Sequence, residues 1–207
     1  MKKILIAAAI AGAFVAAPAS AQWYAGVGVG QGQAKMGTVS ASSGAFTAST
    51  QSTDSSQTSW KLYGGYQFTP NWGIEAQYVD LGRYNYNIVT NVPGVSGTGS
   101  YKANSFGVAG TGTLPLSSDF YLFGKLGVAF NNVKGGNACV SSGALSACQN
   151  SGNGNKTDLL AGIGIGYNFN KNIGVRVEYE DMGKLSKVDN GSSIKGNNWA
   201  VSLKYSF

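Results

Sequence analysis

Apolar residues occupy every second position in eight segments of the chain, and this alternation restricts the fold more than any other feature. Since successive residues of a β-strand point to opposite faces, each segment predicts a strand with one apolar and one polar face. Beyond residue 21, no apolar run approaches the roughly 20 residues that a membrane-spanning helix requires. The segments cover residues 23–30, 60–68, 72–78, 105–114, 120–131, 158–169, 173–180 and 198–207.

The connections between these segments alternate in length. Three are tight, at residues 69–71, 115–119 and 170–172, and four are long and polar, at about 35–56, 83–100, 132–156 and 183–196. Such an asymmetry is typical of barrels in the outer membrane of Gram-negative bacteria, with long loops outside the cell and short turns in the periplasm. The sequence therefore predicts an all-β fold, an eight-stranded antiparallel up-and-down transmembrane β-barrel.

A soluble barrel with its apolar face turned inward shows the same alternation. Three observations favour the membrane barrel. The polar face carries unlike charges that can pair inside a narrow lumen, and its many Gly and Ala residues leave room there. Aromatic residues also gather at the ends of the apolar faces, where membrane-interface girdles lie. These aromatic residues are Trp23, Trp60, Trp72, Phe130, Trp199 and Phe207.

The first residues have the pattern of an export signal. Lys2 and Lys3 form a basic start, residues 4–17 are apolar, and Ala19-Ser20-Ala21 is a small-residue cleavage site. The apolar run, at roughly 14 residues, is too short for a membrane anchor. We therefore expect residues 1–21 to be a cleaved signal peptide and residues 22–207 to form the outer-membrane barrel domain.

Cys139 and Cys148 are the only cysteines, and both lie in a Gly-, Ser- and Asn-rich stretch. In an oxidising compartment, this spacing predicts a disulfide that closes a small loop. Two cysteines in a chain without any histidine cannot complete a tetrahedral metal shell, so we predict neither a metal nor a cofactor. The net charge of +6 is dispersed, so we predict no nucleic-acid partner.

An internal repeat relates the two halves of the chain, because residues 66–83 recur as residues 167–184. The repeat equates the third strand with the seventh, and these strands face each other across an eight-stranded ring. It also equates Glu75 with Arg176. An unpaired charge in a narrow lumen is costly, so we expect this carboxylate and this guanidinium to pair.

Several motifs are spread over nearly all of the predicted mature chain. They are Gly65-Tyr66-Gln67, Gly73-Ile74-Glu75, Leu81-Gly82-Arg83, Tyr101-Lys102-Ala103, residues 121–127, Arg176-Val177-Glu178-Tyr179 and Tyr205-Ser206-Phe207. These motifs resemble the transmembrane domain of the OmpA family. The resemblance implies an eight-stranded barrel, and it implies that Tyr205 and Phe207 help the barrel-assembly machinery to recognise the chain. Because the sequence stops at Phe207, we expect no peptidoglycan-binding domain of the kind found in larger members.

Members of this family carry a lumen gate in which a Glu and an Arg pair and exchange partners with a Lys and a second Glu. Glu75 and Arg176 match the primary pair, whereas the alternative partners align with Thr111 and Gly166. The resemblance therefore does not predict partner exchange. Lys125 could compete for Glu75, and Glu178 or Glu180 could compensate Arg176. We expect these five charged residues to hold the lumen closed.

The absence of histidine removes the usual general base, so we predict that the protein is not an enzyme. We expect a structural outer-membrane barrel with a charge-plugged lumen and four long surface loops. The alternatives are a narrow pore or a conduit for small hydrophobic molecules, and surface adhesion or recognition through the loops. Expected partners are outer-membrane lipid, lipopolysaccharide and the barrel-assembly machinery, with the protein as a monomer.

Overall fold

The computed structural model describes residues 22–36, 40–43, 46–52, 55–142, 145–150, 152–187 and 193–207. The predicted signal peptide lies outside these residues, so its prediction stays untested. No helix in the described part of the chain is long and apolar enough to cross a membrane. The strands are β1 (Gln22–Met36), β2 (Ser40–Ser43), β3 (Phe46–Ser52), β4 (Ser56–Gln67), β5 (Trp72–Thr90), β6 (Val95–Pro115), β7 (Phe120–Ser142), β8 (Leu145–Asn150), β9 (Gly154–Asn168), β10 (Ile173–Lys187) and β11 (Ser193–Ser206).

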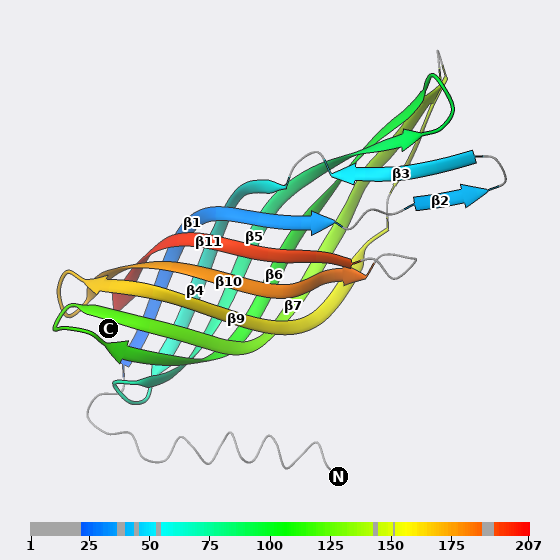
Figure 1. Ribbon diagram of the computed structural model, residues 1–207. Helices are drawn as coiled ribbons and strands as arrows, with labels where there is room; N and C mark the ends of the chain where they lie inside the picture. The colour runs from blue at the N-terminus through cyan, green and yellow to red at the C-terminus, as the bar shows by residue number, and fades with distance from the viewer. Residues whose placement is uncertain are drawn as a thin grey trace, which may run out of the picture.

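Eight of these strands close into a ring (Figure 1). Its order is β1-β4-β5-β6-β7-β9-β10-β11, and β11 pairs with β1 to complete the circle. Every neighbouring pair is antiparallel. The predicted eight-stranded antiparallel barrel is therefore confirmed.

The three tight turns lie where the sequence predicts them, and all share one hydrogen-bonding scheme. In each turn, a backbone N–H donates to the carbonyl of the residue four positions later, which begins the next strand. The residue directly after this donor has a side-chain oxygen that accepts a hydrogen bond from the first backbone N–H of the next strand. Short hydroxyl and amide side chains suit this role because they reach their own backbone. The accepting oxygens belong to Thr69, Ser117 and Asn170.

The opposite end of the barrel differs from the prediction, because strands replace most of the long loops. β5 runs to Thr90 and β6 starts at Val95, so only residues 91–94 join them. The β2–β3 hairpin lies in the first predicted loop, and β8 pairs with β7 in the third. Small polar residues are frequent in the sequence of the extension of β6, so the apolar alternation ends there although the hydrogen-bonded ladder continues.

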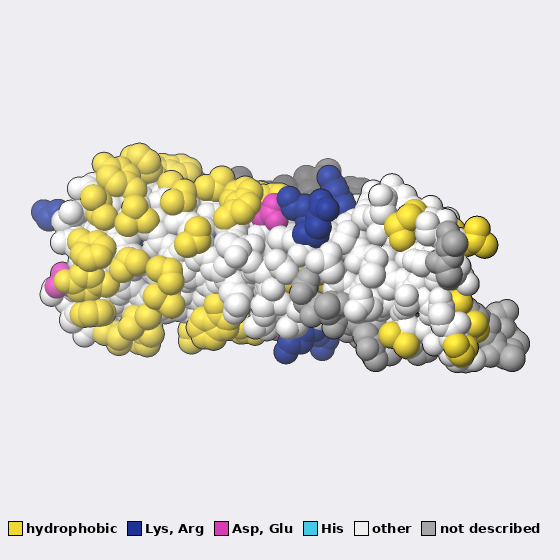
Figure 2. Space-filling model, turned by 90° about the horizontal axis from the view of Figure 1, so that it is seen from above, with side chains coloured by type: hydrophobic (Ala, Val, Ile, Leu, Met, Phe, Trp, Pro, Cys, Tyr) yellow, Lys and Arg dark blue, Asp and Glu magenta, His cyan; other side chains and the backbone are white. Residues whose placement is uncertain are grey.

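The outer wall of the ring is apolar, in contrast to the surface of a soluble protein. Trp23 is 64% exposed and Leu126 is 62% exposed, while their strand neighbours Tyr24 and Lys125 are buried. Figure 2 shows that these apolar side chains cover the part of the barrel next to the tight turns. All six aromatic residues predicted for the girdles lie exposed on this wall.

The interior is divided into two layers along the barrel axis. The layer nearer the tight turns is charged, and the layer above it contains a cluster of apolar side chains beside buried polar residues such as Asn131 and Asn198. We call this cluster the upper apolar cluster. It consists of Ala34, Val79, Leu81, Tyr84, Tyr101, Ala103, Ala109, Ala129, Val133, Leu160, Met182, Leu185 and Ile194.

Two matching β-bulges turn side chains into this cluster. Gly82 and Gly183 have φ angles of +90° and +63°, and each backbone N–H donates to an aspartate two residues before it. The ladder shifts register at both places. Glycine adopts this conformation without a steric penalty. The residue before each glycine, Leu81 or Met182, is fully buried.

Candidate functional site

Glu75 on β5 lies at the centre of the charged layer and accepts hydrogen bonds from three side chains. Arg176 Nη1 donates to Glu75 Oε2 over 2.8 Å, and Lys125 Nζ donates to Glu75 Oε1 over 2.8 Å. The Tyr24 hydroxyl donates to Glu75 Oε2 over 3.0 Å. The contact between Glu75 and Arg176 is the one expected from the repeat. Lys125 binds the same carboxylate together with Arg176 and does not displace it.

Lys125 on β7 connects Glu75 to two further carboxylates. Its Nζ lies 2.7 Å from Glu178 Oε2 and 3.0 Å from Glu180 Oε1. Lys61 on β4 binds the same pair from the other side, 2.6 Å from Glu178 Oε1 and 3.0 Å from Glu180 Oε1. Both carboxylates that could compensate Arg176 therefore bind lysines, and in the described ranges Arg176 forms its salt bridge with Glu75.

We call these six residues the lumen ion network. Three carboxylates, Glu75, Glu178 and Glu180, face three cations, Lys61, Lys125 and Arg176. Their formal charges balance, and none of the six side chains is more than 7% exposed. A balanced network avoids the large cost of an unpaired charge in a dry interior.

Sequence reasoning missed Lys61 as a member of this network. The alternation of β4 places it on the polar face between the outward Trp60 and Leu62. It lies outside the repeat, so no symmetry argument assigned it a partner. The charge balance could have revealed Lys61, because the predicted set contained three carboxylates but only two cations.

Aromatic rings enclose Arg176 on several sides. Its guanidinium carbon lies 4.8 Å from the ring centre of Tyr24, 5.2 Å from that of Tyr63 and 4.7 Å from that of Phe123. The Tyr121 hydroxyl accepts from Arg176 Nε over 3.2 Å. Stacking and hydrogen bonding together fix the planar guanidinium in one orientation.

Glycines on neighbouring strands make room for three of these tyrosine side chains. A Cβ atom at Gly26, Gly65 or Gly166 would overlap the ring of Tyr63, Tyr24 or Tyr121, respectively. At Gly166, the space that a side chain would fill is occupied by the Tyr121 ring, whose hydroxyl binds Arg176.

The lumen opens at the end with the tight turns. A cavity of about 430 Å³ lies there, bounded on its inner side by Arg176 and Lys204. Lys204 Nζ lies over the rings of Tyr24 and Tyr121, at 5.6 and 5.3 Å. Above this vestibule the lumen ion network fills the cross-section, and the upper apolar cluster follows.

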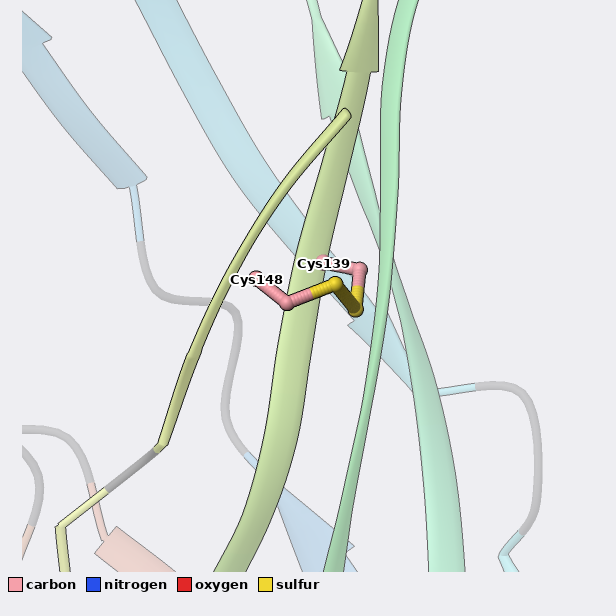
Figure 3. Close-up of a disulfide and its surroundings, with 2 residues drawn as sticks. All are labelled: Cys139 and Cys148. Atoms are coloured by element: carbon pink, nitrogen blue, oxygen red, sulfur yellow. A yellow bond between two sulfur atoms is a disulfide. The ribbon is translucent and has the colours of Figure 1, made fainter. Parts of the chain in front are cut away.

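The predicted disulfide joins Cys139 and Cys148 (Figure 3). The two cysteines lie opposite each other in the β7–β8 pair, well beyond the apolar part of the wall. The disulfide therefore fixes β8 to the extension of β7. No group of three or more metal-ligating side chains occurs in the described ranges.

Tyr205 and Phe207 lie on the outer wall beside the seam between the first and last strands. Their rings are 5.0 Å apart, and both are exposed. The Phe207 N–H donates to the Trp23 carbonyl over 2.9 Å. This placement leaves both side chains accessible to an assembly factor, and their role in recognition stays a prediction.

A closed ring that is apolar outside and polar inside is the arrangement of a β-barrel membrane protein. With eight strands, this chain is a small barrel of that class, located in the outer membrane of a Gram-negative bacterium. The chain belongs to the family of OmpA-like transmembrane domains, whose model matches residues 18–207. The tight turns therefore face the periplasm, and the strand extensions lie outside the cell.

Solved structures with this fold include other small outer-membrane barrels. OprG from Pseudomonas aeruginosa is 15% identical with a TM-score of 0.53, covering 89% of this chain and 95% of OprG. Neisserial surface protein A is 15% identical with a TM-score of 0.51, covering 91% and 99%. Ail from Yersinia pestis, solved with a heparin analogue, is 19% identical with a TM-score of 0.46, covering 90% and 99%. No curated protein matches the chain.

Proposed function

We propose that this protein is a structural barrel of the outer membrane whose lumen is closed to ions and solutes. The observation that carries the proposal is the double filling of the lumen. An ion network blocks the periplasmic half, and a packed apolar cluster blocks the outer half. An eight-stranded barrel has an interior only wide enough for side chains, so either layer is sufficient to exclude solutes.

The proposal is tested by conductance in planar lipid bilayers. We expect no single-channel steps from the wild type, nor from Glu75→Ala or Arg176→Ala, because the upper apolar cluster remains intact in both variants. A variant that combines Glu75→Ala with Leu160→Ala and Met182→Ala opens both layers, and we expect it to conduct. Wild-type steps that change in Glu75→Ala would favour the narrow pore instead.

The same two layers also argue against the alternative function of a conduit for small hydrophobic molecules. Such a conduit requires an apolar path through the upper part of the barrel. Leu81, Leu160, Met182 and Leu185 are fully buried there and pack against one another. We therefore propose that the barrel does not conduct small hydrophobic molecules, and an uptake assay with a hydrophobic dye in vesicles tests this.

A second candidate function is surface recognition, supported by the strand extensions outside the cell. β5, β6 and β7 continue the ladder far beyond the apolar wall, and a disulfide fixes β8 to them. Ordered strands offer a fixed surface, which favours specific binding. Attachment of cells that express the protein to immobilised glycans tests this role. The control is a variant in which a two-residue turn replaces residues 86–99.

The proposal also includes the protein's state and partners. We propose a monomer without catalytic function that is inserted by the barrel-assembly machinery and surrounded by outer-membrane lipid and lipopolysaccharide. Light scattering in detergent tests the oligomeric state. Depletion of the assembly machinery, followed by the amount of folded barrel in the membrane, tests the insertion route.

A further inference from the structure

Three cations form a row across neighbouring strands on the outer wall, where the apolar part of the wall ends. Arg83 on β5 lies opposite Lys102 on β6, and Lys102 lies opposite Lys134 on β7. All three side chains are exposed. We call these residues the first basic row.

A second row of the same kind crosses the other side of the barrel. Lys195 on β11 lies opposite Lys35 on β1 and opposite Lys184 on β10. These side chains are also exposed, and they form the second basic row. The centres of the rows, β6 and β11, are four strands apart in the ring of eight, so the rows are diametrically opposed. The internal repeat contributes to this symmetry, because it equates Arg83 with Lys184.

Both rows lie at the same height, just beyond the aromatic girdle. Lys102 is four residues from Phe106, and Lys134 is four residues from Phe130, its cross-strand neighbour. Lys195 is likewise four residues from Trp199, which packs on Tyr179. Figure 2 shows Lys and Arg side chains at this height, where the apolar wall ends. Aromatic girdles mark the membrane interface, so the rows lie at the level of the lipid headgroups.

Like charges directly opposite each other destabilise a sheet. Lys102 forms a salt bridge with Asp80 over 2.8 Å. Within the described ranges, the other five cations form no salt bridge with a carboxylate. Each row therefore presents more positive charge than the protein itself neutralises, and it does so on the side that faces lipid.

We propose that the two basic rows bind the phosphate groups of a phosphorylated glycolipid in the outer leaflet. Position favours a membrane lipid over a soluble anion, because the rows adjoin the girdle on the outer wall and do not face the lumen. Binding on two opposite sides would fix the depth and tilt of the barrel. This inference rests on the proposed role as a membrane-anchored structural barrel.

The test uses the full barrel in nanodiscs of phosphatidylcholine, with added lipid A that carries both phosphates or neither. Lipid A retained by the barrel is measured by native mass spectrometry. We compare wild type with Arg83→Gln/Lys102→Gln/Lys134→Gln and with Lys35→Gln/Lys184→Gln/Lys195→Gln. The matched control is Arg83→Lys/Lys102→Arg/Lys134→Arg, which preserves charge.

We expect wild type and the charge-preserving control to retain phosphorylated lipid A and to release the dephosphorylated form. Each glutamine triple should lose affinity on the order of 100-fold, because every basic residue near an anionic surface contributes separately. Equal retention of both lipids, or unchanged affinity in both glutamine triples, would overturn the inference. Displacement of lipid A by soluble polyphosphate at equal phosphate concentration would also overturn it.

Two further measurements separate this result from the test of the closed lumen. A heat-dependent shift in detergent gels shows that each triple variant folds. Conductance of the same variants is expected to remain silent, since none of the six residues lies in the lumen. Lost lipid binding with a silent barrel supports both proposals, whereas retained binding with a silent barrel contradicts only the lipid inference.

Discussion

At the scale of single residues, Glu75 connects the two sets of cations in the lumen. It accepts from Arg176, Lys125 and Tyr24, so three strands besides its own depend on one carboxylate. Its removal would leave Arg176 without any carboxylate partner in the lumen ion network. A buried charge that loses its partner retains the full cost of desolvation.

Glu75→Gln is therefore expected to lower the free energy of unfolding by about 3–5 kcal/mol. Urea unfolding in lipid vesicles, followed by tryptophan fluorescence, measures this loss. Asp119→Asn serves as the control, since Asp119 lies exposed in a periplasmic turn and its change should stay within about 0.5 kcal/mol. Equal stability of the Glu75 variant and the wild type would show that Arg176 does not require a carboxylate partner in the lumen.

Gly166 is the second residue whose replacement is informative. Gly166→Ala would push the Tyr121 ring away from Arg176, and we expect a loss of about 1–3 kcal/mol in the free energy of unfolding. Gly124→Ala is the matched control, because a Cβ there meets only a carbonyl oxygen at 3.7 Å. The same urea titration compares both variants. If they lose equal stability, the Tyr121 ring does not require the space at Gly166.

At the scale of elements, the disulfide fixes β8 to the part of β7 that extends beyond the apolar wall. Cys139→Ser with Cys148→Ser should destabilise the β7–β8 pair by about 2.5 kcal/mol through the entropy of loop closure. We expect faster proteolysis of residues 145–150 and an unchanged unfolding midpoint of the barrel. Limited proteolysis and urea unfolding of the same sample check both. A lower midpoint would mean that the hairpin supports the ring.

The alternation predicted the eight strands and the three tight turns because lipid and lumen impose opposite polarity on the two faces. Outside the membrane that constraint ends, and Ser96, Thr98 and Ser100 on β6 resemble loop residues although they lie in a strand. The extensions were therefore predicted as loops. These extensions form strands because their backbones hydrogen-bond to the neighbouring strand, and amino-acid composition does not reveal such hydrogen bonds.

The sequence predicted one part of the barrel interior, the charged contacts, but not the other part, the upper apolar cluster. The repeat identified the contact between Glu75 and Arg176, since it places them on opposite strands. It did not reveal the upper apolar cluster, because the bulges at Gly82 and Gly183 shift the register of the side chains above them. A pattern with a period of two cannot report such a shift. Leu81 and Met182 therefore went unrecognised as core residues.

At the scale of the whole molecule, the C-terminal residue tests the insertion route. Phe207→Ala should reduce the amount of folded barrel in the outer membrane of cells several-fold, through weaker recognition by the assembly machinery. The purified variant should refold in detergent as the wild type does, because the exposed ring contacts little besides Tyr205. Gel shifts on heating measure both amounts. An equal defect in refolding would make Phe207 an ordinary girdle aromatic.

The pairing of β11 with β1 also sets the order of events during biosynthesis. β11, the last ring strand in chain order, completes the ladder with β1, the first ring strand, and the Phe207 N–H donates to the Trp23 carbonyl at that seam. Until then, both edges have unpaired backbone groups that lipid cannot satisfy. A chain in which β11 has not yet paired with β1 is thus a poor substrate for insertion, so closure of the ring and entry into the lipid have to occur together.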